Sequence, residues 1–110
     1  MTSMRVPGFA KGGSVAVTMT AELCDCFATK REGVASVLDA FGVAFPDVEP
    51  RVYAVDGRFR SVQAARSRPL RVAAANWMAS ATLVAQTAPD AIFIDVGSTT
   101  TDVIPILGGR

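Results

Sequence analysis

Residues 91–107 constrain the fold of this chain more than any other stretch, because they read as a strand, a polar turn and a second strand. The apolar run 91–94 is bounded by a turn signal, which predicts a strand that is buried on both faces. Asp95 would then lie at the carboxyl end of a central strand, where open α/β sheets place their ligand sites. Residues 103–107 continue as the second strand, and two glycines supply the next turn.

The turn between these strands holds the residues that suit a ligand. Asp95 and Asp102 flank it, and their carboxylates suit Mg²⁺, bound directly or through water. Successive N–H groups and hydroxyls in the turn would hold phosphate oxygens. The residues expected to do so are Gly97, Ser98, Thr99, Thr100 and Thr101. The pattern also fits a polar hairpin whose side chains satisfy their own backbone, and the residues alone leave both interpretations open.

Length and charge exclude several classes of protein. The 110 residues suit one domain, and an apolar content of 50% is enough for a core. With 11 basic and 10 acidic residues the net charge is +1, so nothing favours nucleic acid or an anionic membrane surface as a partner. The apolar stretches are short for a membrane span, and the first residues lack the pattern of a signal peptide. We therefore expect a cytoplasmic protein.

Two cysteines and the absence of histidine limit metal and redox chemistry. Cys24 and Cys26 are spaced C-x-C, and the chain offers no plausible cluster of further zinc ligands. Residues two apart on a helix point in different directions, so we expect two free thiols on one helix rather than a disulfide. A redox function for the pair is the weakest of the functional hypotheses.

The first part of the chain is expected to form a strand and two helices. Residues 1–13 read as an irregular lead-in, and residues 14–19 alternate as a short strand. Thr20 is a good N-cap for a helix in which Glu22 complements the helix dipole. That helix would have an apolar face made by Leu23, Cys26 and Phe27.

The next helix has stronger signals. The sequence from Thr29 to Glu32 is a capping box. Gly42 is the expected helix stop. Between them lies an apolar stripe at helical spacing, which predicts a core-facing surface formed by Val34, Val37, Leu38 and Phe41.

The middle of the chain predicts a hairpin followed by helices. Residues 51–55 read as a strand, and Asp56-Gly57 is a strong two-residue turn signal. Ser61 is expected to cap a short helix over 62–67, and a long alanine-rich helix to begin near Pro69. Three arginines in this region are interpreted as a solvated surface: Arg66, Arg68 and Arg71. The order of elements predicts an α/β layered domain over 14–110.

Three stretches together resemble the hydantoinase/oxoprolinase family of the actin-like ATPase superfamily. The first is Asp95-Val-Gly-Ser-Thr-Thr-Thr-Asp102, which resembles a phosphate motif of that superfamily. The others are Thr18-Met-Thr-Ala-Glu-Leu-Cys-Asp-Cys-Phe-Ala-Thr-Lys30 and Val55-Asp-Gly-Arg-Phe59, the latter followed by Ala74-Ala-Asn-Trp77. Their order along the chain resembles the order found in the family branch that is linked to tetrahydromethanopterin-dependent C1 transfer and methanofuran biosynthesis.

The resemblance implies a fold, a ligand and a site. It implies a partial ribonuclease H-like (actin-like ATPase) domain, with a mixed sheet and flanking helices. The ligand would be ATP or a diphosphate-activated substrate held with Mg²⁺, and catalysis would rest on positioning and charge stabilisation, with no base assigned. The resemblance implies that Asp25 lies at the cleft and strengthens the case for Arg58 as a phosphate or carboxylate ligand, although a solvated side chain is the alternative for both. Thr18 and Thr20 are candidates because they stand at a strand end, and Asn76 because an amide in a mostly apolar helix needs a partner if it is buried.

One departure from the family pattern leads to a second functional hypothesis. Family members carry an earlier phosphate motif in an N-terminal lobe and a further lobe after the glycine turn, and this sequence shows neither. We therefore expect an internal piece with half a nucleotide cleft. The full-length family is enzymatic and includes hydrolases and transferases. The alternative is a non-catalytic remnant or interaction module that self-associates through an exposed sheet edge after Leu107.

Overall fold

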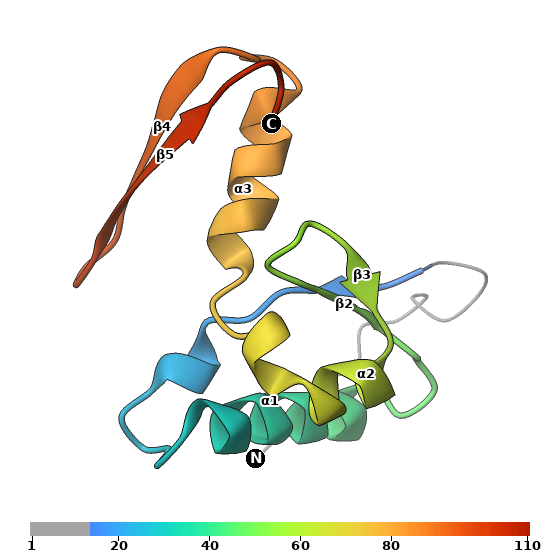
Figure 1. The fold of residues 1–110 in the computed structure, drawn as a ribbon. Helices are drawn as coiled ribbons and strands as arrows, with labels where there is room; N and C mark the ends of the chain where they lie inside the picture. Colours follow the sequence, from blue (N-terminus) through green and yellow to red (C-terminus); the bar gives the residue numbers. More distant parts are fainter. Residues whose placement is uncertain (1–13) are drawn as a thin grey trace.

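Three short strands form a mixed sheet in the first half of the protein (Figure 1). β1 (Ala16–Val17) pairs in parallel with β2 (Arg51–Tyr53), and β2 pairs antiparallel with β3 (Phe59–Arg60). The computed structural model describes residues 14–110, so the lead-in expected for 1–13 lies outside the described residues. Gly57, at φ 77°, allows the turn between β2 and β3, which confirms the expected hairpin.

The helix α1 (Lys30–Ala44) begins with the expected capping box. The Thr29 hydroxyl accepts the N–H of Glu32 at 3.1 Å, and the Glu32 carboxylate reaches back to the N–H of Ala28. Gly42 does not stop the helix, which continues to Ala44. An interior glycine costs a helix only about 1 kcal/mol, and the tilted rings of Phe41 and Phe45, with centroids 4.9 Å apart, support the last turn.

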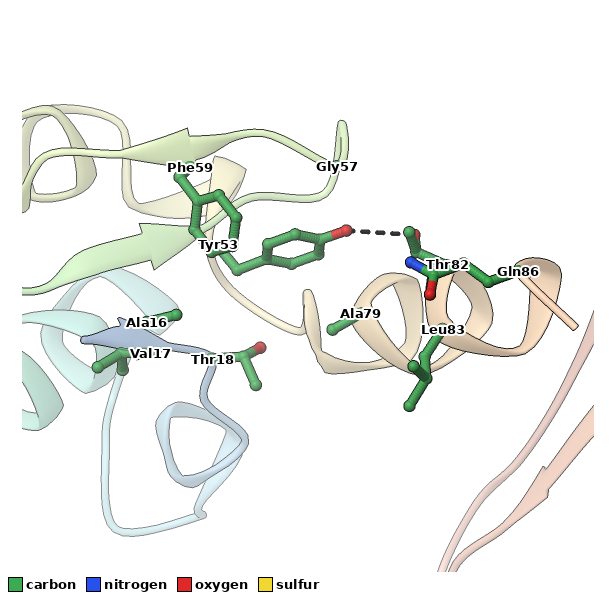
Figure 2. A pocket seen from close by; sticks show the side chains of 10 residues that line it. All are labelled: Ala16, Val17, Thr18, Tyr53, Gly57, Phe59, Ala79, Thr82, Leu83 and Gln86. Carbon is green, nitrogen blue, oxygen red and sulfur yellow. Dashed lines mark hydrogen bonds between the residues drawn. The ribbon is translucent and has the colours of Figure 1, made fainter. Parts of the chain in front are cut away.

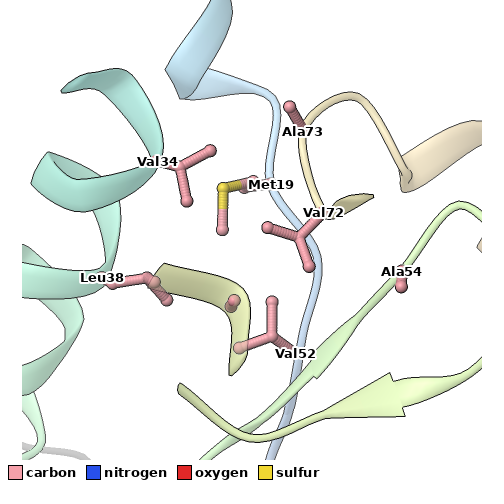
Figure 3. Packing of buried hydrophobic residues seen from close by; sticks show 8 residues of the cluster. Met19, Val34, Leu38, Val52, Ala54, Val72 and Ala73 are labelled. Carbon is pink, nitrogen blue, oxygen red and sulfur yellow. The ribbon is translucent and has the colours of Figure 1, made fainter. Parts of the chain in front are cut away.

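The hydrophobic core lies between the sheet, α1 and α2 (Val62–Ser67) (Figure 3). Val34 and Leu38 from the predicted stripe are buried in it, and Val37 packs at its margin, as expected. The Ser61 hydroxyl accepts the N–H of Ala64, so the expected cap of α2 is confirmed. The buried members of this core are Met19, Val34, Leu38, Val52, Ala54, Ala65, Val72 and Ala73.

The prediction of one long helix that begins near Pro69 is wrong. The chain forms a single 3-10 turn, η2 (Pro69–Arg71), then breaks at Ala74, and only afterwards begins α3 (Asn76–Ala85). Ala74 has a left-handed φ of 53°, which a helix cannot contain. Its N–H donates to the Glu22 carboxylate 52 residues earlier, so a tertiary contact overrides the helix propensity of the alanines.

The first predicted helix is also shorter than expected. η1 (Ala21–Leu23) is one 3-10 turn, the Thr20 side chain does not cap it, and Leu23 is exposed, so the predicted apolar face is wrong. Glu22 is buried, with 2% of its surface exposed, rather than facing solvent at a helix end. The backbone of η1 packs directly on Gly33 of α1, and this contact fixes its position.

The second sheet is a two-stranded hairpin that stands apart from the first (Figure 1). β4 (Ala91–Val96) pairs antiparallel with β5 (Thr101–Ile106), and the base of the hairpin is tied to the end of α3. Asp90 accepts the N–H of Gly108 at 2.9 Å, and the Pro89 carbonyl accepts the N–H of Gly109. Among residues 14–110, no helix is both long and apolar enough to cross a membrane.

Candidate functional site

The polar turn predicted as a phosphate site closes the β4–β5 hairpin. The N–H of Gly97 donates to the Thr100 carbonyl at 2.8 Å, which leaves Ser98 and Thr99 at the tip. A Cβ on Gly97 would lie 3.3 Å from the Thr100 oxygen, so glycine permits the two arms of the turn to approach closely. Residues 97–102 are exposed, and a ligand can therefore reach their hydroxyl and N–H groups.

The two carboxylates expected to hold a metal face each other across the hairpin. Asp95 and Asp102 are direct cross-strand partners, so their side chains point to the same face of the sheet. Directly opposite Cβ atoms in such a pair lie about 4.5–5.5 Å apart. Within residues 14–110 neither carboxylate takes part in an ion pair, and no group of three or more metal-ligating side chains forms. Two adjacent carboxylates, with water or phosphate completing the shell, match what Mg²⁺ takes from a protein.

The predicted setting of this turn is wrong. We expected β4 to be a central strand buried on both faces, but its residues alternate between half-buried and exposed. β4 has a single hydrogen-bonded neighbour among the described strands, and only one face of the hairpin turns towards α3. The hairpin diverges from α3 towards its tip (Figure 1), so the turn lies on a projecting arm rather than in a cleft between parallel strands.

The other predicted cleft residues do not gather around this turn. Thr18 follows β1 and lines a separate cavity, and Thr20 is exposed beside η1. Asp25 is exposed in the turn after η1, and Arg58 is exposed in the β2–β3 hairpin. Asn76 is the half-buried first residue of α3. The structure thus brings together the two carboxylates and the hydroxyl turn, and keeps the remaining candidates elsewhere.

A cavity of about 370 Å³ was not anticipated from the sequence (Figure 2). It lies between β1, the β2–β3 hairpin and α3, and its polar centre is a hydrogen bond of 3.2 Å between Tyr53 and Thr82. The Thr82 hydroxyl already donates to the Met78 carbonyl, so the Tyr53 hydroxyl is the donor. The available sequence signal for this cavity was the spacing of Thr82 on α3 and Gln86, its C-cap, which lie four residues apart. The lining residues are Ala16, Val17, Thr18, Tyr53, Gly57, Phe59, Ala79, Thr82, Leu83 and Gln86.

Asp56 organises the β2–β3 turn next to this cavity. Its carboxylate accepts the N–H of Arg58 at 3.1 Å and pairs with the Arg60 guanidinium at 2.5 Å. Desolvation raises the pKa of Asp56, but the hydrogen bond from Arg58 and the charge of Arg60 outweigh it, so the pKa lies below its ordinary value. The carboxylate therefore supports the turn above its unfolded pKa, and this support is lost as the pH falls through the lowered value.

Both cysteines are free thiols, as expected, but they do not share a helix. η1 ends after Leu23, Cys24 caps it, and Cys26 lies in the following turn. The backbone N–H and the thiol of Cys26 both stabilise the Cys24 thiolate and lower the pKa of Cys24. The helical spacing used to separate the two thiols does not apply, because the helix is too short to contain them.

Comparison with known proteins identifies the family. The family model for hydantoinase/oxoprolinase matches residues 14–110. A relative from Methanocaldococcus jannaschii is 46% identical over 93 residues; its name is (4-{4-[2-(gamma-L-glutamylamino)ethyl]phenoxymethyl}furan-2-yl)methanamine synthase. The similarity covers 84% of this chain and 28% of the relative, so the chain spans less than a third of that protein's length. Because the family model matches nearly all of its residues, the chain belongs to the hydantoinase/oxoprolinase family.

Proposed function

We propose that this chain supplies one wall of a Mg²⁺-dependent phosphate site in a hydantoinase/oxoprolinase-type protein. The protein would have an actin-like ATPase fold and act in the methanofuran and C1-transfer branch of the family. The ligand would be ATP or a substrate activated by a diphosphate. The observation that carries the proposal is the direct opposition of Asp95 and Asp102 beside an exposed turn rich in hydroxyls.

The carboxylate pair is unfavourable without a cation. Like charges that lie directly opposite on one face of a hairpin destabilise it. A bound Mg²⁺ would neutralise charge on the phosphate oxygens and remove the repulsion between the two carboxylates. The contribution of the protein is then to hold Asp95 and Asp102 in register, which the antiparallel ladder on both sides of them does.

The turn offers donors that the hairpin does not use. Within the part of the chain that the structure describes, Ser98, Thr99 and Thr100 donate their N–H groups to no backbone acceptor. Gly97 alone uses its N–H inside the turn. Three free N–H groups and the neighbouring hydroxyls can donate hydrogen bonds to the oxygens of a phosphate next to the metal. The turn would therefore act by binding the phosphate and stabilising its charge. Its described residues include no nucleophile with an activating base.

Calorimetry with pyrophosphate and ATP, with and without Mg²⁺, tests this proposal. We expect weak, Mg²⁺-dependent binding, because the turn is exposed and charge interactions are weak in high dielectric. The double variant Asp95→Asn and Asp102→Asn keeps the shape of both side chains and should lower Mg²⁺-dependent affinity by about tenfold or more. Asp47→Asn, at an exposed position in a loop, is the matched control and should bind as the parent does. Equal Mg²⁺-dependent affinity in the double variant and the parent would refute the assignment.

A second candidate function rests on the opposite face of the same hairpin. Four apolar side chains there are exposed: Ile92 by 71%, Ile94 by 56%, Val96 by 73% and Val103 by 63%. They form one continuous surface, because Ile94 and Val103 are cross-strand partners and the others flank them. Both edges of the two-stranded sheet are also open among the described strands. Exposed apolar strands with open edges pair with other chains, so this face would serve self-association.

Sedimentation velocity over a range of protein concentrations tests the second candidate. We expect the parent chain to self-associate, and the double variant Ile92→Thr and Ile94→Thr to remain monomeric at the same concentrations. Threonine keeps the β-propensity of the strand while removing much of its apolar surface. Val43→Thr is the control, because Val43 is at least as exposed as Ile92 and Ile94 but lies on α1. A monomeric parent, or variants that associate as the parent does, would exclude the hairpin as an interface.

A further inference from the structure

A small basic hollow lies between β3, α2 and η2. Figure 1 shows that α2 and β3 lie apart from the β4–β5 hairpin. The hollow has a volume of about 160 Å³. Three arginines from consecutive segments line it, and none of its lining residues is acidic. The lining residues are Arg60, Ala64, Ser67, Arg68, Arg71 and Val72.

The backbone holds each arginine in place. Arg60 lies on β3 and pairs with Val52 of β2 in the sheet ladder. Arg68 ends α2, and its N–H donates to the Ala64 carbonyl at 3.1 Å. Arg71 ends η2, where its N–H donates to Arg68 and its carbonyl accepts the N–H of Val55 at 2.8 Å. The rim of the hollow is therefore built on hydrogen-bonded segments rather than on a free loop.

The charge of the hollow is only partly balanced by the protein. Among residues 14–110 the ion pairs are Arg60 with Asp56 and Arg66 with Asp39, which leaves Arg68 and Arg71 without an acidic partner. The Nε atom of Arg60 is buried and has no hydrogen-bond partner. No water-sized molecule reaches this Nε, and the Arg60 guanidinium is already paired with Asp56. An anion in the hollow would therefore rely on Arg68 and Arg71.

We propose that this hollow binds a phosphate group, as a second anion site separate from the β4–β5 turn. Its volume suits one phosphate group, whereas cavities that enclose a whole drug-sized molecule measure about 300–1,000 Å³. The two guanidinium groups of Arg68 and Arg71 can together hold a tetrahedral oxyanion, whereas one guanidinium is enough to match a planar carboxylate. Since no carboxylate lines the hollow, binding there needs no Mg²⁺. The Ser67 hydroxyl donates to the Ala64 carbonyl and acts as part of the wall.

Titration of the full chain with inorganic phosphate, in the presence of a chelator that removes Mg²⁺, tests the proposal. We expect saturable binding, and a loss of about tenfold or more in affinity for the double variant Arg68→Gln and Arg71→Gln. Arg31→Gln and Arg51→Gln, which remove two exposed arginines on α1 and β2, form the matched control and should bind as the parent does. Pyrophosphate and acetate are titrated in parallel, and acetate should bind more weakly than phosphate.

Each outcome either supports or overturns the proposed phosphate site. Non-saturable binding, or an equal loss in both double variants, would show general charge attraction and overturn the proposal. Acetate that binds as tightly as phosphate would overturn the ligand class. Circular dichroism of each variant confirms that it is folded. The double variant Asp95→Asn and Asp102→Asn should leave this Mg²⁺-free binding unchanged, so the two anion sites are tested separately.

Discussion

Replacement of Gly33 by alanine is expected to lower the free energy of unfolding by about 3 kcal/mol. A Cβ at this position would lie 2.8 Å from the Cα and 2.9 Å from the carbonyl carbon of Glu22, and both are backbone atoms that cannot rotate away. The methyl group can be accommodated only if η1 moves off α1. Urea unfolding followed by circular dichroism measures the loss.

Gly42→Ala provides a matched control on the same helix. Gly42 also lies within α1, but a Cβ there meets nothing within 4 Å. This substitution should raise the stability by about 0.5–1 kcal/mol, because alanine loses less conformational freedom than glycine in a helix. If both variants shift the unfolding midpoint in the same direction, the close contact between η1 and α1 is not present in solution.

Glu22→Ala is the other substitution with a large expected effect, about 3 kcal/mol of destabilisation. Glu22 is buried, and its carboxylate accepts the N–H of Ala74 at 2.5 Å. Its removal would leave that N–H without an acceptor, and Ala74 would no longer be held in the left-handed conformation between η2 and α3. The cost of such a conformation for a non-glycine residue is about 1–2 kcal/mol.

Two further variants separate the contact from a general effect of charge. Glu22→Gln keeps an oxygen acceptor of the same shape and should be far less destabilising than Glu22→Ala. Glu49→Ala removes an exposed carboxylate and should change the stability by less than about 0.5 kcal/mol. Equal unfolding midpoints for Glu22→Ala and Glu49→Ala would show that the link between residues 22 and 74 contributes nothing.

Local signals predicted the elements whose stabilising contacts lie within a few residues. The capping box of Thr29 and Glu32, the cap at Ser61 and the turn at Gly57 all form as expected, because each depends on neighbours in the sequence. The errors at η1 and Ala74 share one cause. Both segments are fixed by tertiary contacts of Glu22, whose backbone packs on Gly33 and whose carboxylate accepts the N–H of Ala74, 52 residues away. Spacing in the sequence carries no information about such contacts.

In the candidate sites, too, features fixed by neighbours in the sequence were predicted, and features fixed by distant residues were not. The turn with Asp95 and Asp102 follows from sequence, since a hairpin brings its own flanks together. The place of this turn on a projecting two-stranded hairpin does not follow from the sequence. An apolar run such as 91–94 cannot reveal how many strands will pair beside it. The basic hollow was missed because Arg60 comes from a different element than Arg68 and Arg71, and the latter two alone read as solvated surface.

Replacement of Mg²⁺ by Mn²⁺ in an NMR titration tests the central claim most directly. Mn²⁺ broadens the amide signals of residues close to it, and it accepts the same oxygen ligands as Mg²⁺. With pyrophosphate present, we expect broadening centred on residues 95–102, displaced by excess Mg²⁺ and absent from the double variant Asp95→Asn and Asp102→Asn. Broadening centred elsewhere, or unchanged in that variant, would contradict a metal and phosphate site at this turn.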